Sequence, residues 1–163
     1  MSEISSASTT ATYALWKRLP APVRSVAFSA GMCARVPFFA AVFPRVRELE
    51  PGRCVVSGPK WFGVHNHLGT FHAIAACNLA EVAMGMLAEA TVPTTHRWIP
   101  KAMTVQYLAP GRTSLTATAE LAEVPEWNEV TAGRELVVPV SLRDTSGAEV
   151  VHADITIWVS WKV

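Results

Sequence analysis

The sequence has little charge and no block of charge of one sign. Only 17% of its 163 residues are charged, and 14 basic against 13 acidic residues give a formal net charge of +1. A surface that binds nucleic acid concentrates lysine and arginine on one face. Composition therefore gives no reason to expect nucleic acid as a partner.

Cysteine is scarce and is not arranged for cross-linking. The three cysteines, Cys33, Cys54 and Cys77, are odd in number, scattered and surrounded by apolar neighbours. Disulfide-stabilised domains use an even number of cysteines at regular spacings. We therefore expect three reduced cysteines in a cytoplasmic protein.

The sequence also lacks the patterns of a metal site and of a membrane span. His65, His67 and His72 lie close together, but no nearby cysteine or aspartate completes a tetrahedral ligand set. The apolar stretch 26–43 is interrupted by an arginine and a proline. No metal and no stable membrane insertion are predicted.

The N-terminal third is expected to be helical beyond its first residues. Residues 1–12 are rich in serine and threonine, are expected to be disordered, and lack the features of a signal peptide. Short helices are expected at residues 13–18 and 23–34, which two prolines separate. We assign residues 13–50 to an N-terminal helical extension and residues 51–163 to the main domain.

One long apolar helix is expected in the middle of the chain. It follows a first strand, which is predicted at residues 53–56 and 61–64 with a bend between them. The helix is predicted over residues 71–89, with Thr70 as its N-cap. Seven alanines lie between residues 71 and 90, and such small side chains allow a curved sheet to approach closely.

The second half of the chain alternates between apolar and polar residues, which is the pattern of strands with one buried face. The tight turns between these segments require antiparallel pairing. An apolar helix followed by antiparallel strands predicts an α+β fold in which the sheet covers the helix. The alternating segments are residues 101–108, 114–124, 135–143 and 149–161.

The predicted long helix carries an isolated carboxylate, Glu81, among alanine, leucine, methionine and valine. An ionised carboxylate in apolar surroundings is costly unless it is paired, hydrated or functional. The loop before the helix, residues 65–69, is rich in histidine and asparagine. Glu81 and this loop are therefore the candidate functional residues, with a structural ion pair of Glu81 as the alternative.

The spacing of these residues resembles a known motif. Asn66 is followed six positions on by His72-Ala73-Ile74, and four further residues separate this tripeptide from Leu79-Ala80-Glu81. The pattern resembles the acyl-CoA thioesterases of the phenylacetate-degradation type, and also a poorly characterised branch of their superfamily that has an N-terminal helical extension. The resemblance implies a hot-dog fold, in which a curved antiparallel sheet of about five to six strands wraps around one long central helix.

The resemblance also implies roles for individual residues. The catalytic carboxylate falls on Glu81, and the backbone N–H that polarises the thioester carbonyl falls on Ala73. Asn66 and His72 take the positions of the other motif residues. Ala73 and Ile74 replace a glycine pair. A backbone N–H survives this change, but Ile74 narrows the approach.

The distance along the helix restricts how Ala73 and Glu81 cooperate. Eight residues of helix separate them, which is about 12 Å. One thioester carbon cannot contact Glu81 while its oxygen binds the Ala73 N–H of the same chain. The two groups therefore either do not cooperate or come from different subunits. In the second case we expect a homodimer with neighbouring antiparallel helices, as the resemblance also implies, or a tetramer of such dimers.

Six further residues are candidates for substrate binding. Asn78 is expected to hold the Glu81 carboxylate, two methionines to line the acyl chain, and three cations to bind the phosphates of coenzyme A. The structural alternatives are core methionines and solvated charges. No cofactor is expected beyond the coenzyme A of the acyl-CoA substrate. The candidates are Asn78, Met84, Met86, Arg97, Lys101 and Arg112.

Two other functions fit the same fold. Acyl-carrier dehydratases use a histidine fourteen positions before a helix glutamate, as His67 precedes Glu81, although the proline-rich signature of that group is absent here. A non-catalytic acyl-CoA or lipid-binding protein is the second alternative, which Ile74 favours. Hydration of enoyl thioesters, or ligand binding without turnover, would identify these alternatives.

Overall fold

The computed structural model describes residues 10–130 and 132–162. Residues 1–12 were predicted to be disordered: residues 1–9 lie outside the described part, but Ala11 and Thr12 are helical, because α1 begins at Ala11 and not at the predicted residue 13. The helices are α1 Ala11–Arg18, α2 Ala21–Arg35 and α3 Ala73–Thr91, with short 3₁₀ helices η1 Pro37–Val42, η2 Phe62–Val64 and η3 Trp127–Glu129. The strands are β1 Arg45–Glu50, β2 Arg53–Gly58, β3 His96–Tyr107, β4 Leu115–Glu120, β5 Arg134–Arg143 and β6 Glu149–Trp161.

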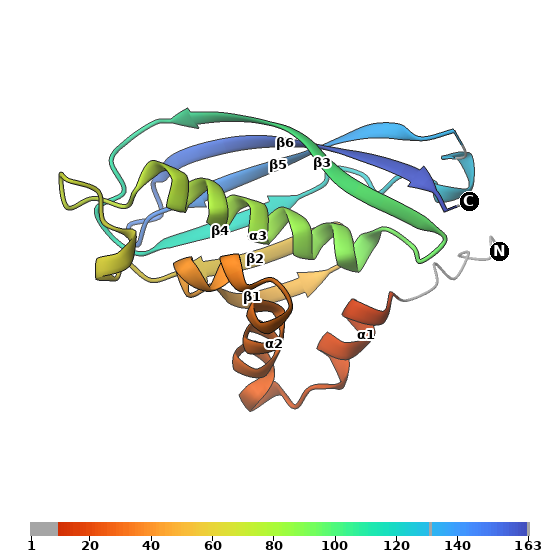
Figure 1. Cartoon of the computed structure of the whole chain (residues 1–163), viewed down its shortest axis with the longest axis horizontal. Coiled ribbons are helices and arrows are strands. Elements are labelled where there is room, and N and C mark those ends of the chain that lie inside the picture. Colours follow the sequence, from red (N-terminus) through yellow and green to blue (C-terminus); the bar gives the residue numbers. More distant parts are fainter. Residues whose placement is uncertain (1–9, 131, 163) are drawn as a thin grey trace.

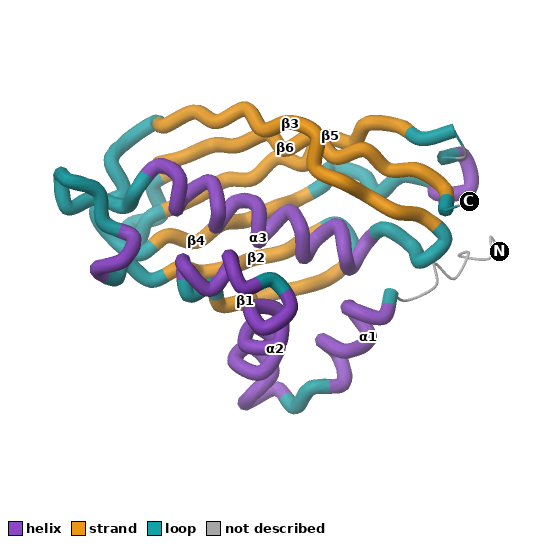
Figure 2. Tube along the Cα trace, in the orientation of Figure 1, coloured by secondary structure: helices purple, strands orange, loops and turns teal. Residues whose placement is uncertain are grey.

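The six strands form one curved antiparallel sheet around α3. Their order is β1-β2-β4-β5-β6-β3, so β1 and β3 are the two edges (Figure 2). Helix α3 runs along one face of the sheet, while α1 and α2 lie beside the edge formed by β1 (Figure 1). This arrangement confirms the predicted α+β hot-dog architecture, with six strands and one central helix.

Close packing against the sheet holds α3 in place. Leu79, Met84 and Leu87 are fully buried, and the alanines between them keep the helix surface low. At β2, a Cβ added to Gly58 would lie only 3.0 Å from the Leu79 side chain, so strand and helix are in close contact. The length and hydropathy of α3 would suit a bilayer, but 67% of its most apolar window is buried, as in core helices.

The edge formed by β1 is covered by α2. Ser25 donates a hydrogen bond to the carbonyl oxygen of Val46, and the Ser29 hydroxyl accepts one of 2.9 Å from the Val46 N–H. The Ser29 hydroxyl in turn donates to the Ser25 carbonyl at 2.7 Å. These bonds satisfy backbone groups that an edge strand otherwise presents to other chains.

Several element boundaries differ from the sequence prediction. Strand β1 was not expected, and it adds a strand within the segment 13–50 that was assigned to the helical extension. Residues 61–64 were predicted as strand but contain η2, because the Trp61 ring packs against Phe43 at 4.8 Å instead of entering the sheet. The strand after α3 begins at His96, before the predicted residue 101.

The outward face of β6 carries a charged cluster. His152 lies 2.9 Å from the Glu149 carboxylate and 3.5 Å from that of Asp154. The hydrogen bond to Glu149 is the main reason that the pKa of His152 is raised above its ordinary value. These groups pair with one another on the surface, as expected for alternating polar residues of a half-buried strand.

We expect Ser29→Ala to lower the free energy of unfolding by about 1–3 kcal/mol, because the buried Val46 N–H loses its acceptor. Urea unfolding followed by circular dichroism measures this loss. Ala27→Ser, which adds a hydroxyl to an exposed position of the same helix, should change stability by less than about 0.5 kcal/mol. Equal stabilities of Ser29→Ala and the unsubstituted protein would show that the β1 edge does not depend on this bond.

Candidate active site

A cavity of about 380 Å³ lies at the N-terminus of α3. The loop before α3 forms one side, the end of β3 and the following turn form the other, and α3 supplies its first turn. Its walls are apolar apart from an asparagine amide, two hydroxyls and backbone groups. The lining residues are Asn66, Leu68, Thr70, Phe71, Ala73, Ala76, Tyr107, Leu108, Ala109, Pro110, Gly111, Leu115 and Val151.

Asn66 organises the loop that enters α3. Its side-chain oxygen accepts hydrogen bonds of 3.0 Å from the N–H groups of Leu68 and Thr70, and its amide donates to the Thr70 hydroxyl at 2.8 Å. Gly69 takes a φ of +70°, which glycine adopts without strain and which lets the loop close tightly. One N–H of the Asn66 amide remains for a bound ligand or water.

His72, and not the expected Thr70, is the N-cap of α3. Its Nδ1 accepts a hydrogen bond of 3.1 Å from the Ile74 N–H, so its Nε2 carries the proton. Ala73 is therefore the first helical residue, and no described residue accepts a hydrogen bond from its N–H. This free donor lies at the positive end of the helix dipole, where a developing negative charge is stabilised.

Tyr107 and Cys77 meet beside the cavity. Tyr107 ends β3 and Cys77 lies one turn beyond Ala73 on α3, with 3.3 Å between the phenol oxygen and Sγ. The hydrogen bond with Cys77 is the largest of the effects that raise the pKa of Tyr107 to about 12. The phenol therefore keeps its proton at neutral pH, and this one hydrogen is shared with Cys77 or, where the thiol donates instead, points to another acceptor.

Glu81 does not reach this cavity. It lies two turns beyond Ala73 on α3, about 12 Å along the helix axis, and is half-buried. Among the described residues, no carboxylate lines the cavity. The described residues of one chain therefore supply a free N–H at the helix N-terminus and the apolar walls of a cavity, but no carboxylate at that cavity.

The family profile described as "Domain of unknown function (DUF4442)" matches residues 24–159. The chain belongs to the DUF4442 family. No curated protein matches the sequence of this DUF4442 protein significantly. Because the matched residues begin inside α2, the family includes most of the N-terminal extension as well as the sheet and α3.

Solved structures share the fold of this DUF4442 protein. A crystal structure from structural genomics is 38% identical, with a TM-score of 0.77, and the alignment covers 93% of this chain and 96% of the other. A Pseudomonas aeruginosa protein called a probable thioesterase is 21% identical, with 88% and 97% covered and a TM-score of 0.74. A thioesterase from Haemophilus influenzae is 14% identical, with 90% and 95% covered and a TM-score of 0.70. The predicted hot-dog fold of thioesterase-family proteins is confirmed.

Three other candidates are placed in the interior of the DUF4442 fold. The Asn78 amide donates to the Phe38 carbonyl at 3.3 Å and so joins α3 to η1, whereas the sequence placed it beside Glu81. Met84 and Met86 belong to the packed core, and neither lines the cavity at the N-terminus of α3. The structural alternative of core methionines therefore accounts for the positions of Met84 and Met86.

The three candidate cations lie on the surface. Arg97 donates to the Ser160 hydroxyl at 3.2 Å, and Lys101 is ion-paired with Glu135, which ties β3 and β5 together across β6. Arg112 is exposed and directly follows Gly111, which lines the cavity. Of the three, Arg112 is the one next to the candidate site.

Sequence reasoning proposed Asn66 and Ala73, which line the cavity of this DUF4442 protein, and His72, which caps α3, but it did not single out Tyr107 and Cys77 as a pair. The alternation of residues 101–108 did place Tyr107 on the same strand face as Met103 and Val105. The position of Cys77, one turn before Glu81, was the other available signal. Neither signal shows that the end of β3 lies beside the first turns of α3, because this depends on how the strand and the helix pack in the folded protein.

We expect Asn66→Ala to lower the free energy of unfolding by about 1–2 kcal/mol, because the N–H groups of Leu68 and Thr70 lose their acceptor. Urea unfolding measures the effect. Asn66→Asp keeps both acceptor contacts and should recover most of the loss, while His67→Ala at the exposed neighbouring position serves as a control. A stable Asn66→Ala variant would contradict the loop-forming role.

Proposed function

We propose that this protein is a thioesterase that hydrolyses acyl-CoA as a homodimer. The observation that carries the proposal is the cavity at the N-terminus of α3, which is lined by Ala73 but by no carboxylate among the residues that the structure describes. Glu81 of the partner subunit completes the site. The fold shared with proteins named thioesterases supports the same reaction class.

The proposed reaction uses two groups of the protein, a carboxylate and a backbone N–H. Glu81 of the partner subunit takes a proton from water as the water oxygen attacks the thioester carbon. The Ala73 N–H donates a hydrogen bond to the oxygen that becomes negative. The C–S bond then breaks, and the proton passes from Glu81 of the partner subunit to the leaving thiolate. The products are a carboxylic acid and the free thiol of coenzyme A, and no metal ion is needed.

The surface around Glu81 supports pairing with a second copy. Ile74 on α3 and Tyr107 on β3 are 61% and 53% exposed, although both are large and hydrophobic. Strand β3 is an edge of the sheet, and no described strand pairs with its outer side, so this side can bind another strand. A two-fold axis beside β3 would cover this surface and bring each Glu81 towards the N-terminus of the other α3. A tetramer of two dimers is compatible with the same site.

The acyl group and the coenzyme A part of the substrate would contact different parts of the proposed site. The acyl group would occupy the apolar cavity against Phe71 and Leu108, which line it. The phosphates of coenzyme A would meet cations at the rim, for which Arg112 is the best-placed candidate and Arg97 and Lys101 are more distant ones. The three free cysteines are in keeping with a cytoplasmic location for the enzyme.

A non-catalytic acyl-CoA-binding protein is the second candidate, and the exposure of Ile74 beside Ala73 favours it. A large side chain at this position would restrict access of a thioester to the Ala73 N–H. His67, which a dehydratase would use, is exposed and does not line the cavity. Release of free thiol from acyl-CoA separates hydrolysis from both alternatives.

We expect Glu81→Gln to lower kcat for thiol release by about 10²–10⁴-fold, because the general base is lost. The measurement is release of free coenzyme A thiol from short, long and aromatic acyl-CoA substrates. Glu89→Gln, two turns further along α3, is the matched control: Glu89 binds Thr12 and Trp98 and should leave kcat unchanged. Full activity of a folded Glu81→Gln variant would reject the assignment.

Ala73→Pro tests the oxyanion donor, because proline removes the N–H and is well tolerated as the first residue of a helix. The preceding His72 already has the extended backbone that a following proline requires, with ψ of 137°. We expect kcat to fall by about 10²–10³-fold while the helix content is unchanged.

Mixing this variant with Glu81→Gln tests whether the two groups come from different subunits. After joint refolding, each mixed dimer contains one complete site, so random pairing should restore about a quarter of the unsubstituted activity. A mixture as inactive as its components would place both groups in one chain and overturn the dimeric site.

A further inference from the structure

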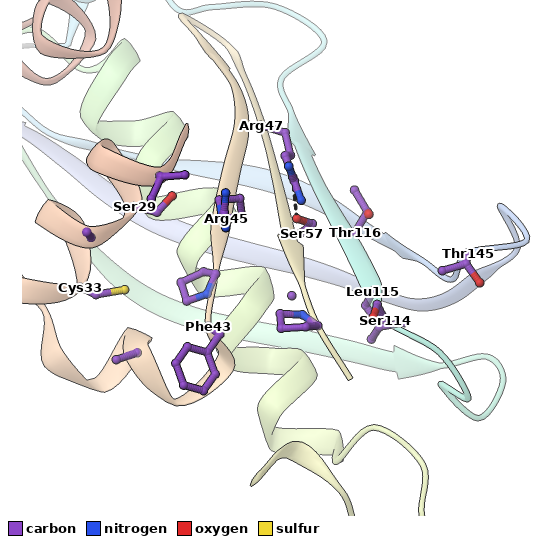
Figure 3. A pocket seen from close by; sticks show the side chains of 16 residues that line it. Ser29, Cys33, Phe43, Arg45, Arg47, Ser57, Ser114, Leu115, Thr116 and Thr145 are labelled. Atoms are coloured by element: carbon purple, nitrogen blue, oxygen red, sulfur yellow. Dashed lines mark hydrogen bonds between the residues drawn. The ribbon is translucent and has the colours of Figure 1, made fainter. Parts of the chain in front are cut away.

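A second and larger cavity, of about 660 Å³, lies between α2, the beginnings of β1 and β4, and the end of β2. Its polar strand residues lie on the outer face of the sheet, because Arg45, Ser57 and Thr116 alternate along their strands with buried core residues. Figure 3 shows Ser29 and Cys33 of α2 on one side and Thr145 on the other, with Phe43 at one end. The proposed reaction at the N-terminus of α3 uses none of the polar residues of this cavity.

A row of polar side chains crosses the floor of this outer cavity. Arg45 of β1 is paired with Ser57 of β2, and Ser57 is paired with Thr116 of β4. Residues paired in this way on neighbouring strands point to the same face, about 5 Å apart. The sheet therefore places Arg45, Ser57 and Thr116 side by side on one face, so that one arginine and two hydroxyl side chains lie in a row (Figure 3).

Arg47 adds a second guanidinium to this row. It sits at an irregularity of β1, between Val46 and Glu48, and its Nε donates to the Ser57 hydroxyl at 2.8 Å. The two terminal nitrogens of Arg47 remain for another acceptor, and Ser57, which accepts the bond, can still donate its own hydrogen. The bond with Ser57 holds the planar fork over the cavity before any ligand arrives.

The positive charge in the outer cavity is not neutralised. No carboxylate lines it among the described residues, and neither Arg45 nor Arg47 forms an ion pair with a described residue. Glu48, the acidic neighbour on β1, instead pairs with Arg53, which also binds Glu120. Two arginines without counter-ions beside fixed hydroxyls form a site for an anion, and paired guanidinium forks suit phosphate in particular.

The remaining wall of the outer cavity is apolar. Val26 and Ala30 of α2 face it, and Phe43 closes one end. The Phe43 backbone is left-handed, with φ of 44° and ψ of 53°, which costs energy for a residue other than glycine. Trp61 holds it there through edge-to-face packing and is itself fixed by a bond of 3.2 Å to the Ala41 carbonyl. Strain that is retained by surrounding contacts places a large aromatic ring beside the guanidinium pair.

We propose that the outer cavity binds an organic phosphate that carries an apolar group. The phosphate lies between Arg45 and Arg47 and accepts hydrogen bonds from Ser57 and Thr116, while the apolar group packs against α2 and Phe43. The cavity volume suits a small organic molecule rather than a bare ion. This inference stands on the outer face of the sheet and does not depend on thioester hydrolysis.

Isothermal titration with octyl phosphate, below its micelle concentration, tests the site. The full-length protein should bind octyl phosphate at least about tenfold more tightly than inorganic phosphate, because the octyl group buries apolar surface on α2. The uncharged octyl glucoside should bind more weakly than octyl phosphate by a similar factor. Equal affinities for octyl phosphate and either comparison compound would overturn the proposal.

Three substitutions locate the binding. Arg45→Gln and Arg47→Gln should each weaken octyl phosphate binding about tenfold to hundredfold, because a charge-assisted hydrogen bond is lost. Arg134→Gln makes the same change of charge at an exposed residue outside the cavity and should have no effect. Circular dichroism checks that each variant is folded. Binding that survives in both folded cavity variants lies elsewhere and rejects this site.

Ala30→Phe tests the apolar part separately, because Ala30 is exposed on α2 and its enlargement fills the outer cavity without disturbing the core. We expect octyl phosphate to bind Ala30→Phe about as weakly as inorganic phosphate binds the unsubstituted protein, while the affinity for inorganic phosphate is kept. Unchanged affinity for octyl phosphate would show that its chain does not lie against α2.

Discussion

The packing of α3 against the concave face of the sheet is the constraint on which the rest of the structure depends. Small side chains on the helix and Gly58 on β2 allow contact so close that the helix cannot shift or rotate without overlap. This contact fixes where the helix begins, and with it the Ala73 N–H. It also selects which residues stay outside the core. Leu79 is fully buried, while Cys77 and Glu81 lie along the less covered side, towards β3.

The elements that follow one periodic pattern could be predicted from the sequence. Strand β6 has strict alternation, and α3 is a long apolar segment bounded by a polar loop, so both were found within two residues of their ends. Strand β1 was missed because its sequence, Arg-Val-Arg-Glu-Leu-Glu, buries Val46 and Leu49, which are three residues apart. The irregularity at Arg47 explains this spacing, and no local pattern indicates it.

The two cavities differ in how much the sequence says about them. Asn66, His72 and Ala73 are close together in the chain, so their spacing could be compared with the motif of the family that the sequence resembles. The outer cavity depends on Arg45, Ser57 and Thr116, which are brought together only by the register of three strands. Sequence reasoning cannot place such a row until strand order is known, and β1 itself was not predicted.

The unequal treatment of the two sheet edges limits how copies of this chain can associate. Two hydroxyl groups of α2 form hydrogen bonds with the backbone of β1, whereas the twelve residues of β3 form the opposite edge of the sheet. Growth of a fibre by strand addition requires two exposed sheet edges on every molecule, and here α2 of the same chain already covers one of them. When two molecules pair through their β3 edges, neither has an exposed edge left, so assembly by this route stops at a dimer.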